Sequence, residues 1–139
     1  MNTGYSNQDL TGALPAGLGD LGPALKRLGL DGNQISELPT ELGALTGLTY
    51  LNLAYNALTS LPSEIAAIPG LKFLYLSGNQ LTGVPSEFRT VNPTRICYLF
   101  RNPSFSCANV GAGTSCCTGD KRFGSNCGAG LSGGPCYQG

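Results

Sequence analysis

Apolar residues recur in this chain at a fixed step of 23 residues, and this repetition constrains the fold more than any other feature. Three consecutive segments carry leucine, leucine, leucine and asparagine at the same places, and a fourth keeps the last two. The columns are Leu25, Leu48, Leu71 and Thr94; Leu28, Leu51, Leu74 and Cys97; Leu30, Leu53, Leu76 and Leu99; and Asn33, Asn56, Asn79 and Asn102. Such repetition is typical of a solenoid, in which each unit packs on its neighbours.

Each segment is predicted to contain a short β-strand. Leu28 and Leu30 lie two residues apart, so their side chains face one side of an extended chain, and Gly29 between them faces the other. One segment offers about seven apolar side chains, worth ~1.5–3 kcal/mol each when buried. Ordering its backbone costs ~1–2 kcal/mol per residue. Since a single segment is not stable alone, we expect the segments to stack around one core.

The asparagine column has a structural explanation. Each asparagine stands where the predicted strand turns a corner, and the backbone groups there have no strand partner. A carboxamide carries both donors and acceptors, so it can satisfy these groups. We therefore interpret Asn33, Asn56, Asn79 and Asn102 as a structural ladder and not as reactive groups.

The full pattern L-x-x-L-x-L-x-x-N-x-[IL]-x-x-[LV]-P resembles the leucine-rich-repeat family over roughly residues 8–107. The resemblance implies an α/β fold: a right-handed solenoid with a concave parallel β-sheet, short convex helices or 3₁₀ turns, and a disulfide-rich C-terminal cap. Leu10, Leu14 and Leu18 match only the second half of the pattern, so the chain is expected to begin inside a solenoid. We expect a truncated repeat over residues 1–24, three full repeats over 25–93, and a terminal repeat with a Cys/Gly-rich cap over 94–139.

On the convex side, a proline, a hydroxyl residue and a glutamate follow one another in three repeats. We expect the hydroxyl residues to cap short helices, because a side-chain oxygen there can accept a hydrogen bond from a free backbone N–H. The glutamates would lie in the first turn, where the helix dipole favours a carboxylate. The caps are Thr40, Ser63 and Ser86, and the acidic residues are Glu41, Glu64 and Glu87.

All six cysteines lie near the C-terminus, which predicts three disulfides and an oxidising compartment. They are Cys97, Cys107, Cys116, Cys117, Cys127 and Cys136. Histidine is absent and no two C-x-x-C motifs occur, which argues against a zinc site. We therefore expect a secreted or cell-surface protein, with an organelle lumen as the alternative, although residues 1–7 do not read as a signal peptide.

The cysteine-rich end fits two arrangements. The run from Asn102 to Cys107, Asn-Pro-Ser-Phe-Ser-Cys, resembles the start of C-terminal caps in extracellular leucine-rich-repeat proteins. The spacing around Cys116 and Cys117 resembles inhibitor cystine knots instead. The disulfide pairing stays open in both cases.

The concave side is predicted to combine aromatic rings with cations. It carries six of the eleven aromatic residues and five of the eight basic ones, and only Asp31 opposes their charge. Aromatic residues with arginine are typical of binding hot spots, although cross-strand aromatic pairs also stabilise sheets by ~0.2–1 kcal/mol. We interpret this face as a ligand-binding surface formed by Tyr50, Tyr55, Lys72, Phe73, Tyr75, Arg95, Tyr98, Phe100 and Arg101, with Lys26 and Arg27 at its edge.

Two function classes follow from these features. The first is a non-enzymatic recognition module that binds a protein or an anionic glycan through the concave face, without cofactor or metal. The second is a structural or assembly subunit of a larger complex. Catalysis is disfavoured because the chain lacks histidine, the usual base beside a nucleophilic serine or cysteine. A net charge of zero argues against nucleic acid, and no apolar run reaches the ~20 residues needed to enter a membrane.

Overall fold

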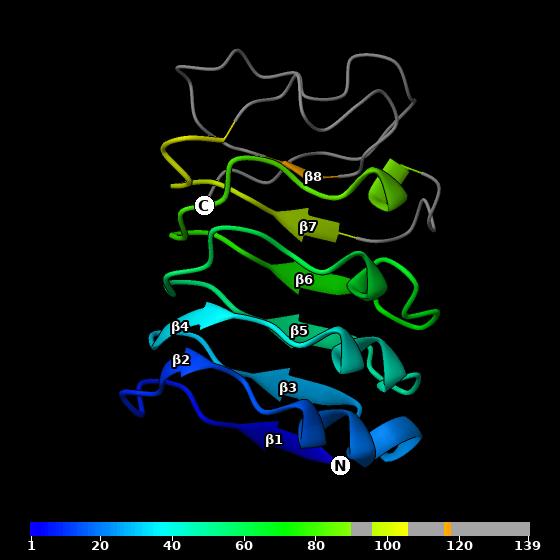
Figure 1. Cartoon of the computed structure of the whole chain (residues 1–139). Helices are drawn as coiled ribbons and strands as arrows, with labels where there is room; N and C mark the ends of the chain where they lie inside the picture. Colours follow the sequence, from blue (N-terminus) through cyan, green and yellow to red (C-terminus); the bar gives the residue numbers. More distant parts are fainter. Residues whose placement is uncertain (90–95, 106–115, 118–139) are drawn as a thin grey trace.

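The computed structural model of the chain describes residues 1–89, 96–105 and 116–117. Its main element is a parallel β-sheet in which each strand lies beside the strand of the next coil (Figure 1). The strand order is β1 (Asn2–Gly4), β3 (Arg27–Gly29), β5 (Tyr50–Asn52), β6 (Phe73–Tyr75), β7 (Ile96–Tyr98) and β8 (Cys116–Cys117). The predicted parallel sheet is therefore present.

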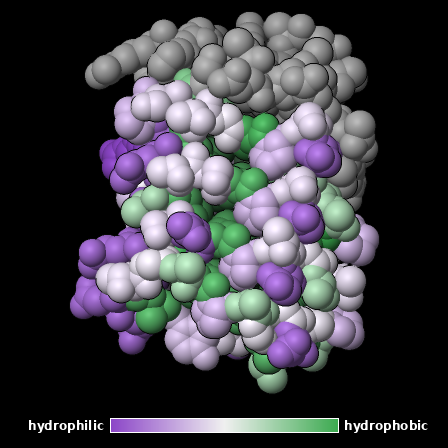
Figure 2. Space-filling model, viewed as in Figure 1, coloured by the Kyte–Doolittle hydropathy of each residue, from purple (hydrophilic) through white to green (hydrophobic). Residues whose placement is uncertain are grey.

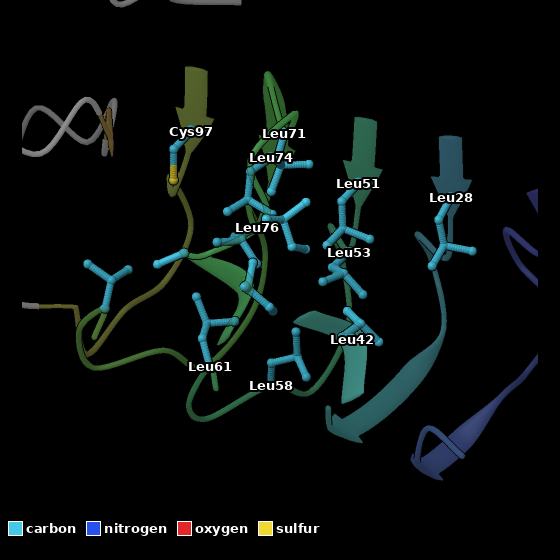
Figure 3. Packing of buried hydrophobic residues seen from close by; sticks show 14 of the residues in the cluster. Leu28, Leu42, Leu51, Leu53, Leu58, Leu61, Leu71, Leu74, Leu76 and Cys97 are labelled. Atoms are coloured by element: carbon cyan, nitrogen blue, oxygen red, sulfur yellow. The ribbon is translucent and has the colours of Figure 1, made fainter. Parts of the chain in front are cut away.

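The leucine columns set the register of this sheet. Leu28 pairs with Leu51, Leu51 with Leu74, and Leu74 with Cys97. The three leucine side chains are fully buried and Cys97 is 1% exposed, and Figure 3 shows the four lying in line on successive strands. Each leucine contributes ~1.5–3 kcal/mol by leaving water, so a shift in register would expose a whole column.

The first repeat contains a strand of its own, which the repeat pattern did not predict. Thr3 in β1 pairs with Leu28 in β3, and the backbone N–H of Tyr5 donates to Gly29 O over 2.7 Å. Thr3 and Leu28 are 25 residues apart, whereas Leu28 and Leu51 are 23 apart. The two additional residues, together with Thr3 and Tyr5 at places that hold leucine later, hide this strand from the repeat pattern.

A second, two-stranded sheet flanks the main one. It pairs β2 (Thr11–Ala13) with β4 (Gln34–Glu37) in parallel, with an irregularity between Gly12 and Ala13. Figure 1 shows β2 and β4 stacked at one side of the coils, where the chain leaves the main sheet. The sequence pattern did not predict this sheet.

The convex side carries 3₁₀ helices, as expected. They are η1 (Ala16–Ala24), η2 (Thr40–Ala44), η3 (Ser63–Ile65) and η4 (Ser86–Arg89). The apolar side chains of Leu42 and Ile65 close the core from this side and are fully buried. On the surface seen in Figure 2, the hydrophobic residues form a narrow central column with hydrophilic residues around it.

The predicted capping role of the hydroxyl residues is wrong for η2 and η3. Pro39 and Pro62 occupy the capping positions in extended conformation, and no side chain caps either helix. Because each helix begins one residue earlier than expected, the hydroxyl residue is already inside its first turn. The hydroxyls of Thr40 and Ser63 instead donate to the carboxylate of the following glutamate, over 3.2 and 3.3 Å, as does that of Ser86 over 3.2 Å.

The cysteine-rich cap lies outside the described residues, apart from its first members. Cys97 packs in the core, and Phe105 beside the same core is 4% exposed. The side chains of Cys107, Cys116, Cys117, Cys127 and Cys136 fall outside the part of the chain that the structure describes, so the three-disulfide cap stays a prediction. No helix in the described ranges is long and apolar enough to cross a membrane.

Candidate binding face

The asparagine column lies at the corner that follows each strand of the main sheet. The amide of Asn79 donates to Leu53 O and Leu76 O, both over 2.9 Å, and its carbonyl accepts from Leu58 N over 3.0 Å. The side chain thus satisfies backbone groups in its own coil and in the coil before it. Asn56 and Asn102 repeat this arrangement. These asparagines hold the coils, and hence the strands that carry the face, at fixed spacing.

The concave face, meaning the side of the main sheet opposite the leucine core, carries a continuous row of aromatic rings. Ring centroids are 6.4 Å apart for Tyr50 and Phe73, 5.3 Å for Tyr50 and Tyr75, and 4.8 Å for Tyr75 and Tyr98. Tyr98 meets Phe100 edge to face at 6.2 Å. We call this row, which spans β5 to the end of β7, the aromatic strip: Tyr50, Phe73, Tyr75, Tyr98 and Phe100.

The strip forms because the residues between the leucines stand at matching register positions. Phe73 lies opposite Tyr50 across β5 and β6, and Tyr98 lies opposite Tyr75 across β6 and β7. Neighbouring strands are ~4.8 Å apart, which is close enough for the rings to touch. Phe73 is 38% exposed, and Tyr50, Tyr75 and Tyr98 are half-buried, so solvent reaches part of each ring.

A cation lies against one end of the strip. The guanidinium carbon of Arg27 is 4.2 Å from the centroid of the Tyr50 ring, in a cation–π contact. Arg27 comes from β3, the strand before the first ring, so the contact fixes Tyr50 from the side. The sequence placed both residues on this face but gave no sign of the contact itself.

The surroundings of Tyr75, the residue at the centre of the strip, shift the pKa of its phenol. Burial raises the pKa of the Tyr75 phenol above its usual value of 10.0, and the neighbouring Tyr50 and Tyr98 add to this, while Arg27 opposes it. Burial and neighbouring phenols both disfavour the charged form of an acid. Tyr75 is therefore uncharged at physiological pH.

Tyr55 and Arg101 lie at the rim where the strands end. Both have left-handed backbone conformations, with φ of 55° and 58°. Their side chains meet across two coils, where Arg101 Nη1 donates to the Tyr55 hydroxyl over 3.4 Å. Tyr55 is 50% exposed, and Arg101 is exposed.

The charge of the face is positive within the described residues. Lys26, Arg27, Lys72 and Arg101 are exposed. The half-buried Asp31 carboxylate accepts hydrogen bonds from the Ser6 hydroxyl over 2.7 Å and from the Asn52 amide over 2.9 Å. Arg95, the remaining cation predicted for this face, lies outside the described residues. In the described ranges, no group of three His, Cys, Asp or Glu residues is placed to hold a metal ion.

Residues 23–81 match a family model described as leucine rich repeat. The chain is a leucine-rich-repeat protein. Two of the solved structures that resemble it are the following. A leucine-rich-repeat protein of Leptospira interrogans is 35% identical with a TM-score of 0.64, over 69% of this chain and 24% of that one. The BIR2 ectodomain from Arabidopsis thaliana is 27% identical with a TM-score of 0.60, over 81% of this chain and 65% of that one.

This leucine-rich-repeat protein thus spans about a quarter of the length of the Leptospira chain and about two thirds of the ectodomain's length. Among curated proteins, none matches its sequence significantly.

Proposed function

We propose that this leucine-rich-repeat protein is a non-enzymatic recognition module, and that its concave face binds a partner protein with the aromatic strip at the centre. Leucine-rich-repeat domains are generally protein-interaction modules, and solenoids offer extended concave surfaces for binding. The single observation that carries the proposal is the unbroken row of partly exposed rings across three strands.

The geometry of the strip suits a binding surface because its rings are already ordered. Tyr75 is held between Tyr50 and Tyr98, with centroid separations of 5.3 and 4.8 Å. A partner that covers these rings would lose little further side-chain entropy, which otherwise costs ~0.5–1.5 kcal/mol per ordered side chain. Tyrosine is also among the residues that most often dominate binding energy.

The charges around the strip favour a partner with acidic groups. Lys72 and Arg101 are both exposed, and neither forms an ion pair with an acidic side chain in the described ranges. Complementary charge steers association and excludes wrong partners. An anionic glycan would meet the same cations, so the experiment below separates it from a protein.

We also propose that the protein works in an oxidising compartment, secreted or at the cell surface. The support is the six clustered cysteines, which fit a disulfide-stapled cap. An extracellular binding module with a stapled end would resist unfolding where chaperones are absent.

Site-specific photo-crosslinking tests the proposal. The photoreactive amino acid p-benzoyl-phenylalanine replaces Phe73, which it resembles, and in a matched control it replaces Glu64 on the convex side. Each variant is irradiated with proteins from the native source. We expect a protein adduct from position 73 that is absent from position 64, and expect excess unlabelled protein to compete it away.

Three results would contradict the proposal. Adducts formed only from position 64 would favour a structural subunit that assembles through its convex side. An adduct of position 73 with a sulfated or carboxylated glycan, with no protein adduct, would favour the glycan. Adducts from position 73 that excess unlabelled protein does not reduce would be non-specific.

A further inference from the structure

Tyr55 and Arg101 occupy a backbone position that in the other described coils is asparagine or glycine. The same position is taken by Asn7, with φ of 54°, Gly32, with φ of 67°, and Gly78, with φ of 70°. Left-handed φ is unfavourable for residues with a side chain, and above all for bulky ones. Glycine and asparagine tolerate this conformation, so the tyrosine and the arginine add strain that the solenoid does not require. Strain of this kind points to a role for the side chains.

The two side chains converge because the glycine between them leaves room. A Cβ placed on Gly78 would lie 2.5 Å from Cδ1 of Tyr55, so the tyrosine ring fills the space above this glycine. The backbone beneath is pinned, since Tyr55 N donates to Ser77 O over 2.7 Å and Gly78 N donates to Phe100 O over 2.9 Å. The ring therefore reaches across one whole coil to Arg101 in the next.

The resulting pair has unused binding capacity. A guanidinium carries five N–H donors in a planar fork that matches a carboxylate, and Arg101 uses one of them for the phenol oxygen of Tyr55. That contact, at 3.4 Å, takes a lone pair of the phenol and leaves its O–H free to donate. Arginine and phenol together can thus give three hydrogen bonds to one carboxylate, two of them charge-assisted.

The pair stands at one end of the aromatic strip. Arg101 directly follows Phe100, whose ring meets Tyr98 at 6.2 Å. A protein segment that lies along the strip from Tyr50 to Phe100 would therefore leave the face beside Tyr55 and Arg101. The described part of the chain supplies no acidic side chain to this rim pair.

We propose that Tyr55 and Arg101 form a carboxylate site that takes an aspartate or glutamate side chain of the partner protein. The inference rests on the proposed function, because it assumes a protein on the strip. The inference goes beyond the proposed function because it identifies the place where the acidic group of that partner binds and the two residues that hold it.

Glycine substitutions test the side chains of Tyr55 and Arg101 separately from the backbone conformation. Arg101→Gly and Tyr55→Gly each remove a side chain and suit the left-handed backbone, so neither should disturb folding. Lys72→Gln is the matched control, because it removes one exposed positive charge elsewhere on the same face. The probe is a phage-displayed library of random peptides selected on the unaltered protein, followed by a synthetic selected peptide and its analogue with Asp→Asn or Glu→Gln.

We expect the selected peptides to contain an acidic residue beside aromatic or apolar ones. Neutralising that residue should weaken binding to the unaltered protein and to Lys72→Gln at least about tenfold, the scale of one charge-assisted hydrogen bond. Neutralising the acidic residue of the peptide should alter its binding to Arg101→Gly by less than about twofold, because this variant already lacks the guanidinium that binds the carboxylate.

Two outcomes would overturn the inference, and they are distinguishable. Equal weakening in the unaltered protein and in Arg101→Gly, or selected peptides without acidic residues, would mean that Arg101 is not the site, while the proposed function stands. Peptides that bind the Tyr75→Ala/Tyr98→Ala double variant as tightly as the unaltered protein would refute the proposed function too.

Discussion

The ring of Tyr75 stacks on the ring of Tyr98, with 4.8 Å between centroids and 9° between planes. The two residues are direct partners in β6 and β7, and the ring separation equals the usual spacing of neighbouring strands, ~4.8 Å. Tyr50 cannot stack in this way, because the partner of Tyr75 in β5 is Asn52. Its ring therefore tilts by 44° and meets Tyr75 diagonally. The strip is ordered by sheet register before any ligand arrives.

Replacing Asn79 by alanine should destabilise the protein strongly. Asn79 is 3% exposed and satisfies three backbone groups, and each buried group left unpaired costs ~1–3 kcal/mol. We expect a loss of about 2–4 kcal/mol in the free energy of unfolding, measured by urea denaturation. The neighbouring exposed Gln80 is the control, and Gln80→Ala should change stability by less than about 0.5 kcal/mol. Similar effects of the two substitutions would contradict the ladder.

Gly78→Ala should destabilise the protein through both its backbone and the space above it. A left-handed alanine costs ~1–2 kcal/mol, and the new methyl group would meet the Tyr55 ring. Adding Tyr55→Gly removes the clash but not the backbone cost, so the double variant should recover part of the loss in a urea titration. If Gly78→Ala is equally destabilising with and without Tyr55, the ring does not lie over this glycine.

Much of the fold could be predicted from the sequence, because leucine placement determines register directly. Leu28, Leu51 and Leu74 fall on one column of the sequence and on one row of the sheet. The rings between them were placed on one face by the same alternation. The strand β1 was missed because Thr3 stands where later coils have leucine. Its backbone pairing with β3, which the side-chain pattern does not encode, holds it in place.

Contacts that depend on side-chain direction could not be predicted. The link between Tyr55 and Arg101 arises from backbone with positive φ. Glycine at the same repeat position, in Gly32 and Gly78, was a sign of that conformation, but it could not show that the two side chains meet. The contact of Arg27 with Tyr50 depends on the rotamer of a long side chain. The predicted capping role of Thr40 was wrong for a local reason. Pro39 occupies the capping position, so the helix begins one residue earlier than a hydroxyl cap would require.

Stability should fall with rising pH above about 10 because of Tyr75. Its folded pKa is raised by burial, with Tyr50 and Tyr98 adding to the shift, so the folded state holds the proton more tightly than the unfolded state does. This contribution is present below the unfolded pKa, near 10, and is lost as pH rises through the higher folded pKa. Urea midpoints between pH 9 and 11.5 should fall less in Tyr75→Phe. Identical slopes in both proteins would exclude this origin.

Reduction of the protein should lower its melting temperature. If the six cysteines form three disulfides, each contributes ~2–5 kcal/mol, and reduction should lower Tm by at least about 5 °C. Calorimetry with and without reductant measures the shift, and thiol titration of the denatured, unreduced protein provides the control. The titration should find no free thiol. Six free thiols would contradict the predicted disulfide-bonded cap and the inferred oxidising compartment.

The affinity of the Tyr75→Ala/Tyr98→Ala double variant for the crosslinked partner tests most directly whether the aromatic strip binds that partner. Far-ultraviolet circular dichroism and a urea midpoint establish that the variant is folded, and Glu41→Ala/Glu64→Ala on the convex side is the matched control. We expect a loss of about 2 kcal/mol or more, roughly a thirtyfold rise in Kd, for the concave variant. The convex variant should keep its Kd within about twofold. A folded concave variant with unchanged Kd would contradict the account.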